Sequence, residues 1–363
     1  MKVFLKHSDG SLKDEKGNVI FFSFDRFVND ICEGGCCFMC GASPKEKEFN
    51  EEHVIPKWVL RMLDIYKLKI ILPNQASVRY DQYTVPCCKN CNSFLGTNVE
   101  EEIRAVIDGG LESVNSYIQE NGPWKIFLWL SLIFFKTHLK DSYTRKHLDR
   151  RKGDESISSD YDWGLLHHIH CMVRALQNGI SIENECLGSL LVLPAKTAEH
   201  LDSYDYRDIY AANTILLRIN DIAFLAVLDD SCAALNFFSG HFNRLSAPLS
   251  PLQLREVLSH LTLLNYKLKY RPSYQTKFDP KTSDFYISAN IPETLELEDH
   301  TREELGEILY ANVSEYVTKM PCPDTYFTED NVSKGCYSFL FDENGEFISN
   351  SMDLIELSTS DST

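Results

Sequence analysis

The alternation of apolar and polar positions predicts a chain of short strands and longer helices. Two short apolar runs around a polar turn, "KVFLKHSDG" and "KGNVIFFSF", predict an N-terminal hairpin. The run "WKIFLWLSLIFF", from Trp124 to Phe135 with Lys136 beside it, is too short to span a bilayer and predicts a buried helix. The stretch "YDWGLLHHIHCMVRALQNG" predicts an amphipathic helix that ends at Gly179, with its histidines serving helix packing.

From about Leu187 the pattern changes to apolar runs of strand length. The runs "LGSLLVLPA", "DIAFLAVLDD" and "CAALNFF" predict strands, and "SPLQLREVLSHLTLLNYKLKY" and "TREELGEILYANVSEYV" predict helices. The stretch "CYSFLFDENGEFISN" predicts a last hairpin with Asn-Gly in its turn. This order of segments predicts an α+β fold class. We expect an N-terminal strand extension, a cysteine-rich module, a helical segment and a mixed α/β C-terminal domain at residues 1–30, 31–110, 111–185 and 186–363.

Composition and charge then narrow the class of protein. The apolar fraction of 44% and the 21 Phe and 17 Tyr exclude a disordered chain. The first residues, "MKVFLKHSDG", turn polar before any apolar run forms, so we expect a cytoplasmic protein outside any membrane. The net charge of −17 excludes a general nucleic-acid coat, because phosphate binding depends on Lys and Arg, but it allows a nuclease with one local basic surface.

Seven of the twelve cysteines lie in the segment 32–91. This segment contains two Cys-x-x-Cys pairs, Cys37 with Cys40 and Cys88 with Cys91. Each pair presents two thiolates at a separation that suits zinc, so together they predict a four-sulfur site in a reducing compartment. Cys36 and Cys87 adjoin the pairs and are alternative ligands, so the spacing leaves the register open. The competing interpretation is a set of buried structural thiols.

A histidine stands between the two pairs. "EEHVIP" predicts a short strand that stops at Pro56, with Glu52 and His53 on opposite faces, and "YTVPC" predicts the returning strand. "CNSFLGTNVEEEIRAVIDGG" predicts a helix, so that two strands and a helix pinned by zinc would place His53 near Asn92. A metal ion held by the Glu52 carboxylate and the Asn92 amide oxygen can bind a phosphate, and His53 can deprotonate a water aimed at it. The alternative is a buried histidine inside a structural zinc knuckle.

The motif "EHVIPKW", flanked by "CFMC" and "CKNCN", resembles the zinc-stapled kind of HNH (ββα-metal) nucleases, over about a fifth of the chain. Enzymes of that family cut nucleic-acid phosphodiesters with one divalent metal ion. The resemblance implies that His53 is the general base and that Glu52 and Asn92 hold a catalytic Mg²⁺ or Mn²⁺. It also implies that structural zinc is bound by Cys37, Cys40, Cys88 and Cys91.

The sequence departs from the family pattern on the second strand. The family carries a central Asn there that orients the histidine, whereas this chain reads "RYDQYTVPCC". Asp81 and Gln82 are the residues available for that role. The glutamates later in the helix predict a solvated face, except that Glu100 lies eight positions, about two turns, beyond Asn92 and is a candidate for a supporting role.

The most basic stretch of the chain is the segment 136–153, with seven Lys or Arg against two Asp. It is a candidate surface for phosphate contacts, and the alternative is a solvated helix end and linker. The candidate nucleic-acid contacts are Lys57, Lys146, Arg150 and Arg151.

These features predict a metal-dependent endonuclease that acts on nucleic acid, with DNA favoured over RNA. Proteins of this layout resemble effectors of bacterial anti-phage defence, and we expect the C-terminal domain to supply recognition, a protein partner or a homo-oligomer contact. Two alternatives come from the same residues. One is a non-catalytic zinc module that binds nucleic acid or protein, and the other is an RNA-cleaving toxin.

Overall fold

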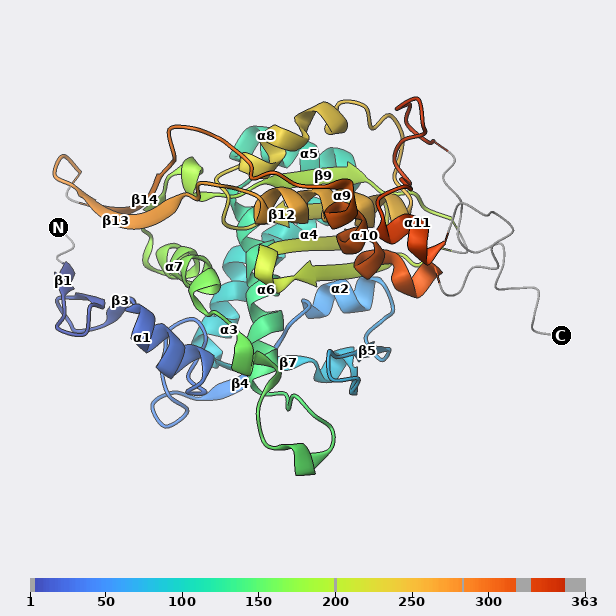
Figure 1. Cartoon of the computed structure of the whole chain (residues 1–363). Helices are drawn as coiled ribbons and strands as arrows, with labels where there is room; N and C mark the ends of the chain where they lie inside the picture. Colours follow the sequence, from blue (N-terminus) through green and yellow to red (C-terminus); the bar gives the residue numbers. More distant parts are fainter. Residues whose placement is uncertain (1–3, 199–200, 283, 318–327, 350–363) are drawn as a thin grey trace. The chain divides into compact units, whose positions relative to one another are not determined.

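The computed structural model describes residues 4–198, 201–282, 284–317 and 328–349 (Figure 1). The chain forms two compact units, each assembled from three separate segments. The N-terminal unit comprises residues 1–109, 120–186 and 273–290. The C-terminal unit comprises residues 110–119, 187–272 and 291–363. The cysteine-rich module therefore shares its unit with residues 120–186 and with a segment from late in the chain.

The N-terminal unit begins with three strands where the sequence predicted a hairpin of two. The strands β1 (Phe4–Lys6), β2 (Leu12–Asp14) and β3 (Val19–Phe21) form an antiparallel sheet in that order. The additional reversal is closed by Asp14, whose carboxylate accepts hydrogen bonds from the backbone N–H of Lys16 and of Asn18, at 2.9 and 2.8 Å. A carboxylate that bonds its own backbone in this way makes a tight turn, which divides the first apolar run from the second.

The cysteine-rich module contains two paired strands followed by a helix. The strands β4 (Phe49–His53) and β7 (Thr84–Cys88) are antiparallel, as the sequence predicted. The helix α3 (Lys89–Leu95) follows β7 directly and packs against both strands. One π-helical turn (Gly96–Glu100) then leads into α4 (Glu101–Asp108), so the predicted helix is continuous in direction but widened in the middle. The chain between the strands forms α2 (Lys57–Met62), β5 (Lys69–Ile71) and β6 (Ser77–Arg79).

The predicted buried helix is confirmed. α6 (Trp124–Ser142) is buried along nearly all of its length and packs against α7, β7 and α4. Its apolar residues occupy every side of the helix, which is the pattern of a helix enclosed by protein rather than one that faces water. α7 (Gly164–Asn178) ends where predicted, with Gly179 in the left-handed conformation at φ 62°. No helix in the described ranges is long and apolar enough to cross a bilayer.

A segment from late in the chain completes the N-terminal unit. The strands β13 (Ser273–Asp279) and β14 (Asp284–Asn290) form a hairpin, and β14 pairs in parallel with β8 (Ser181–Ile182). Ile287 of β14 packs in one apolar cluster with Phe21 of β3. The remaining elements of this unit are the short α1 (Phe24–Arg26) and a π-helical turn at Phe27–Cys32.

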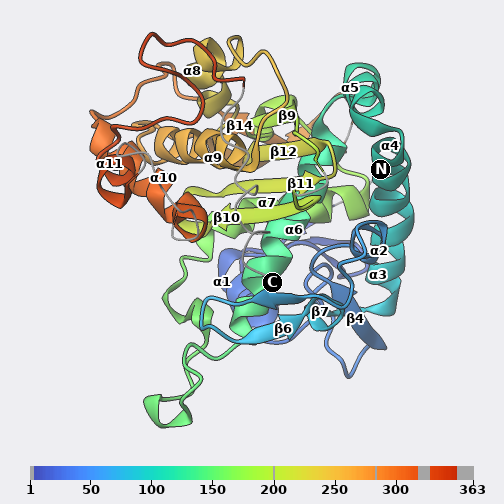
Figure 2. The same cartoon turned by 90° about the vertical axis from the view of Figure 1, so that its right-hand side faces the viewer.

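The C-terminal unit is built on a four-stranded antiparallel sheet. Its order is β10 (Tyr204–Ile209), β11 (Thr214–Ile219), β12 (Ile222–Val227) and β9 (Leu190–Pro194), which can be followed in Figure 2. Every residue of β11 and β12 is buried, and the helix α9 (Pro251–Tyr266) packs against both strands. The two strands predicted from "LGSLLVLPA" and "DIAFLAVLDD" are therefore confirmed, and so is the helix at α9. The other helices are α5 (Gly110–Asn121), α10 (Arg302–Val317) and α11 (Glu329–Ser333).

The strand predicted at "CAALNFF" is wrong, because this run forms the helix α8 (Ala233–Phe242). The cause lies just before it. The buried carboxylate of Asp230 accepts hydrogen bonds from the backbone N–H of Ala234 and the hydroxyl of Ser189, both at 2.7 Å, and so caps the start of the helix. A short apolar run does not by itself distinguish a strand from a buried helix. The last predicted hairpin is present only as a tight turn, with a single bridging pair between Phe341 and Phe347.

Candidate metal centre and adjoining histidine

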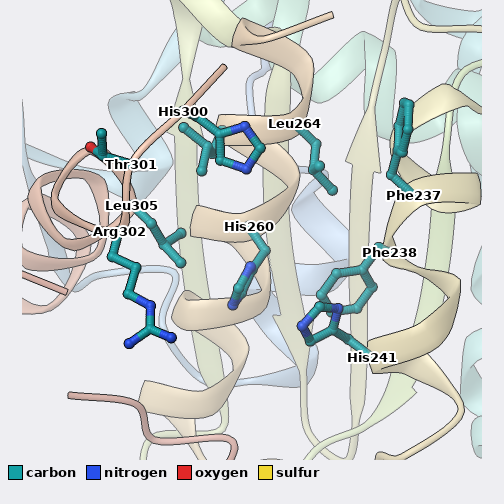
Figure 3. Close-up of a pocket in the computed structure, with 10 residues that line it drawn as sticks. Phe237, Phe238, His241, His260, Leu264, His300, Thr301, Arg302 and Leu305 are labelled. Atoms are coloured by element: carbon teal, nitrogen blue, oxygen red, sulfur yellow. The ribbon is translucent and has the colours of Figure 1, made fainter. Parts of the chain in front are cut away.

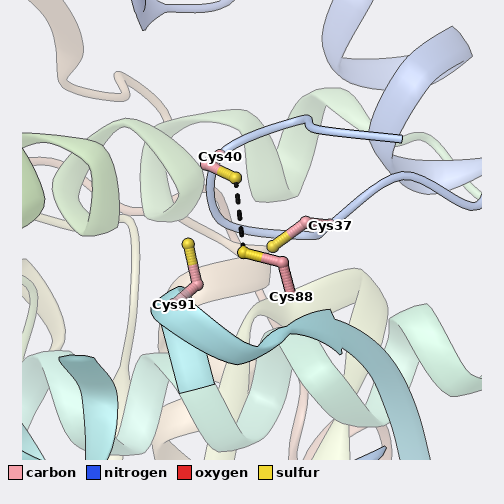
Figure 4. A group of neighbouring side chains, drawn as sticks. All are labelled: Cys37, Cys40, Cys88 and Cys91. Carbon is pink, nitrogen blue, oxygen red and sulfur yellow. Dashed lines mark hydrogen bonds between the residues drawn. The ribbon is translucent and has the colours of Figure 1, made fainter. Parts of the chain in front are cut away.

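Four cysteines converge in the N-terminal unit. The Sγ atoms of Cys37, Cys40, Cys88 and Cys91 all lie within 4.8 Å of one another (Figure 4). This resolves the register, since Cys36 and Cys87 do not join the group, although the sulfur of Cys87 lies 3.8 Å from that of Cys37. Four thiolates from two Cys-x-x-Cys turns at this spacing form a set that can hold a metal ion.

The backbone around each pair is shaped for this convergence. In the first pair, the N–H of Gly41 donates to the carbonyl of Cys37 at 2.8 Å, and Gly41 has a φ of +66°. A Cβ at Gly41 would lie 2.4 Å from a ring carbon of Phe22, so any side chain there would clash. In the second pair, Cys88 caps the start of α3 and Cys91 lies within its first turn. The two turns therefore come from a loop and from a helix start.

Polar groups around the cluster donate to its sulfurs. The amide of Gln177 in α7 donates to Cys91 Sγ at 3.3 Å, and the ammonium of Lys47 donates to Cys40 Sγ at 3.5 Å. Donors of this kind stabilise thiolates, which is the form that binds a metal. The sequence offered no signal for Gln177, which lies 86 residues from Cys91 along the chain.

The strand β4 connects the cluster to the predicted site. Phe49 pairs with Cys88 at one end of β4, and His53 pairs with Thr84 at the other. Glu52 is buried at 7% exposure and His53 is half-buried. The two residues are adjacent on one strand, and that strand is fixed by pairing to the chain that carries two of the four cysteines.

A buried ion pair joins this strand to α6. The ammonium of Lys136, 2% exposed, lies 2.7 Å from Glu52 Oε1 and 2.7 Å from the backbone carbonyl of His53. The sequence placed Lys136 in the basic segment as a candidate for the surface, and the structure corrects this. The sequence feature that could have predicted the burial of Lys136 is its position directly after an apolar helical run. A lysine that is buried in this way requires an opposite charge beside it.

Glu100, at the end of the π-helical turn, lies in the same buried environment. Burial raises the pKa of Glu100 to about 7, with the charge of Lys136 lowering it and the charge of Glu52 raising it. Glu100 is therefore not part of the solvated helix face that the sequence predicted for the glutamates, whereas Glu101 is exposed as expected. Glu52 thus pairs directly with the Lys136 ammonium, whereas Glu100 interacts with it through charge alone.

The imidazole of His53 has a buried nitrogen, Nε2, with no hydrogen-bond partner in the described part of the chain. Its ring centroid lies 6.0 Å from that of Tyr66. Burial lowers the pKa of His53, and the charge of Glu52 opposes this shift. A neutral imidazole with a free nitrogen is the form that accepts a proton from water.

The other two predicted participants make no hydrogen bond to His53 among the described residues. Asn92 belongs to α3, and its side chain makes no hydrogen bond among the described residues. Asp81, in the turn before β7, forms an ion pair with Arg79 and acts on His53 only through its charge, which raises the pKa of the histidine. The orienting residue of the family thus has no hydrogen-bonded counterpart here.

The described residues supply few ligands for a second, catalytic metal ion. Outside the four cysteines, no group of three His, Cys, Asp or Glu side chains converges in the described ranges. Glu52 Oε1 is engaged by Lys136, which leaves Oε2 and the amide oxygen of Asn92 as donors. A carboxylate and an amide oxygen are suitable ligands for Mg²⁺, which keeps several waters.

The candidate nucleic-acid contacts differ in how free their charges are. Lys57 is exposed at the start of α2, and its ammonium lies 5.8 Å from the centre of the Tyr66 ring that faces His53. Lys146 pairs with Asp160 and Arg151 pairs with Asp149, while Arg150 is exposed. Much of the basic segment is thus neutralised by its own neighbours, which favours a solvated linker over a phosphate-binding surface.

The histidines of α7 pack in the interior. His168 Nε2 lies 3.0 Å from the carbonyl of Cys186, and its ring stacks on Tyr274 with centroids 3.5 Å apart. Burial lowers the pKa of His168 to about 4. The unfolded chain therefore binds more protons between that value and the ordinary value near 6.5, and stability falls as the pH drops through this window.

Lowering the pH from 7 to 5 should reduce the unfolding free energy of the wild type. We expect this reduction to be about 2 kcal/mol smaller in His168→Phe, which keeps an aromatic ring against Tyr274 but cannot take up a proton. Urea denaturation at the two pH values measures this difference. The exposed His7→Gln is the matched control, and it should behave like the wild type. Equal pH dependence in His168→Phe and wild type would contradict the prediction.

Comparisons with family models, with curated proteins and with solved structures found no match for this chain.

Proposed function

We propose that this chain is a metal-dependent endonuclease of the HNH kind that hydrolyses phosphodiester bonds in DNA. The observation that supports this most is the free, buried Nε2 of His53, next to a buried carboxylate, on a strand tied to the four-cysteine cluster. A strand pair and a helix then hold a proton acceptor and candidate metal donors within one small module.

In this proposal each residue has one role. Zinc on the four cysteines fixes the ends of the module, and its binding contributes folding free energy. A Mg²⁺ or Mn²⁺ at Glu52 Oε2 and the Asn92 amide would polarise the phosphate and neutralise its charge. Lys136 holds Glu52 by its other oxygen, Oε1, and so orients the carboxylate. His53 takes the proton of the attacking water at Nε2, and Lys57 contacts the nucleic-acid backbone.

The net charge of −17 suits an enzyme with little standing affinity for DNA, and the exposed Lys57 and Arg61, both beside the Tyr66 ring, supply the local basic surface in this proposal. We propose that the protein works in the bacterial cytoplasm as an effector of anti-phage defence. In that role the C-terminal unit supplies recognition, a protein partner or contact with a second copy of the chain.

A second function has an observation in its favour. Lys136 already neutralises Glu52, and outside the four cysteines no group of three His, Cys, Asp or Glu side chains converges among the described residues. This supports a module that binds nucleic acid or protein around structural zinc and performs no reaction.

The test is nicking of supercoiled plasmid by wild type and His53→Ala in Mg²⁺ and in Mn²⁺. We expect metal-dependent nicking by the wild type and a loss on the order of 10²–10⁴-fold in His53→Ala, the usual contribution of a general base. His7→Ala, at an exposed histidine, is the control and should retain full activity. Zinc content and melting temperature should be the same in all three proteins.

Equal nicking by wild type and His53→Ala would overturn the assignment of the base. Cleavage of transcripts in preference to plasmid would replace the DNA enzyme by an RNA-cleaving one. If neither substrate is cut in either metal while the fold and the zinc are intact, the binding module is the correct function.

A further inference from the structure

The C-terminal unit contains a hollow that the proposed nuclease does not use (Figure 3). A cavity of about 880 Å³ and an adjoining one of about 270 Å³ share His241, His260, Arg302 and Leu305. They lie between α8, α9, the start of α10 and the segment 335–348. This size falls in the range of cavities that hold small molecules.

The larger cavity is lined by cations without carboxylate partners, and one of them, Arg302, also lines the smaller cavity. Arg302 is exposed and forms no ion pair or hydrogen bond through its side chain within the described ranges. The guanidinium of Arg244 lies 4.0 Å from the centre of the Phe341 ring and pairs with no carboxylate in the same part of the chain. Two free guanidinium groups at one cavity are an unusual feature in a chain of net charge −17.

The acidic side chains of the lining are mostly engaged by the protein itself. Glu256 accepts hydrogen bonds from the hydroxyl of Ser338 at 2.6 Å and the backbone N–H of Leu340 at 3.1 Å. Asp342 accepts from the backbone N–H of Asn344 at 2.9 Å. Glu343 remains as a solvent-facing carboxylate. These hydrogen bonds leave the carboxylates charged but direct Glu256 and Asp342 to the protein's own donors, whereas Arg244 and Arg302 have no carboxylate partner in the described ranges.

Two imidazoles line the middle of the hollow. The rings of His241 and His260 have centroids 5.2 Å apart and come from two different helices, as Figure 3 shows. Phe238 stacks against His241 at 5.4 Å with the planes 13° apart, which fixes the orientation of that ring. Neither imidazole makes a hydrogen bond to the described residues. His260 Nε2 lies 3.9 Å from the carboxylate of Glu256, and the nitrogen atoms of His241 remain for a ligand.

The smaller cavity forms an apolar end. Its side chains include two aromatic rings and three leucines, namely Phe237, Phe238, Leu263, Leu264 and Leu305. A ligand that fits both ends has an anionic group at the arginines and a flat apolar body among the Phe and Leu side chains. Arginine binds phosphate through parallel N–H groups, and aromatic side chains pack well against a planar base.

We propose that this hollow binds a small nucleotide, with its phosphate at Arg244 and Arg302 and its base in the apolar end. The imidazoles of His241 and His260 donate to the phosphate or the ribose. This site is separate from the proposed nuclease centre and does not depend on that function.

Isothermal titration of the full chain tests the proposal. The protein carries His53→Ala, so that the result does not depend on nuclease activity. The probes are AMP, ADP, GMP and GDP, with inorganic phosphate and adenosine as the two part-ligands. We expect one molecule of at least one nucleotide to bind per chain, at least tenfold more tightly than either part-ligand.

The double variant Arg244→Gln/Arg302→Gln should weaken that binding at least tenfold with an unchanged melting temperature. Lys269→Gln, an exposed cation of the same unit, is the matched control and should leave binding unchanged. Binding that survives the double variant, or no binding of any of the four nucleotides, would overturn the proposal. Equal affinity for inorganic phosphate would also overturn it, because the hollow would then be an anion site without a base pocket.

Discussion

We expect the four-cysteine cluster to bind zinc, and we expect removal of that zinc to unfold the cysteine-rich module. Structural zinc contributes roughly 10 kcal/mol or more in small zinc domains, and the module has two short strands and one short helix around this cluster. Circular dichroism and melting temperature before and after treatment with a zinc chelator measure the effect, with zinc content determined by mass spectrometry. Metal-free protein with an unchanged melting temperature would contradict it.

The neighbouring cysteines provide a matched pair of variants for the same prediction. Cys88→Ser removes a member of the cluster and should abolish zinc binding, whereas Cys36→Ser removes a thiol that lies outside it and should retain one zinc per chain. If Cys36→Ser loses its zinc and Cys88→Ser keeps it, the ligands include Cys36 and Cys87 in place of their neighbours Cys37 and Cys88.

The second large effect is expected at the buried ion pair. Lys136→Met leaves the Glu52 carboxylate buried without its partner, so we expect the unfolding free energy to fall by about 3–5 kcal/mol. Urea denaturation of the purified variant measures this loss. The double variant Glu52→Gln/Lys136→Met removes both charges of the pair and should recover most of it, because the remaining carboxyl there, Glu100, has a pKa that burial raises to about 7 and can take up a proton.

Lys125 supplies the control for this cycle. It lies on the same helix and pairs with Glu102, and that pair is less buried, with side chains 15% and 42% exposed against 2% and 10% for Lys136 and Glu52. Lys125→Met should therefore cost about 1 kcal/mol or less. Equal losses at Lys125 and Lys136 would show that burial of the pair does not determine its contribution.

The elements that the sequence predicted correctly are those defined by local patterns. The strands around "EEHVIP" and "YTVPC", the buried helix at Trp124 and the helix end at Gly179 depend on residues a few positions apart. The four-cysteine group follows in the same way, because each pair has the spacing that a metal requires. Its register, however, depends on which thiols converge in space, and only the structure decided between Cys36 and Cys37.

The features that were missed depend on contacts between distant parts of the chain. Lys136 and Glu52 lie 84 residues apart, so the sequence showed a lysine in a basic segment rather than one side of a buried pair. In the basic segment, Arg151 forms an ion pair with Asp149 and Lys146 forms one with Asp160. The number of Lys and Arg in the sequence therefore overstates the positive charge that is free to bind phosphate. At α8, the cap from Asp230 selected a helix from a run that suits either structure.

The path of the chain through the two units limits how this protein can be divided. The N-terminal unit takes β13 and β14 from residues 273–290, between two segments of the C-terminal unit. A fragment that stops at residue 186 lacks both strands, so β8 has no partner and Ile287 is missing from the apolar cluster. The N-terminal unit is therefore not contained in one continuous stretch of the chain, and no single cut of the backbone releases it whole from the C-terminal unit.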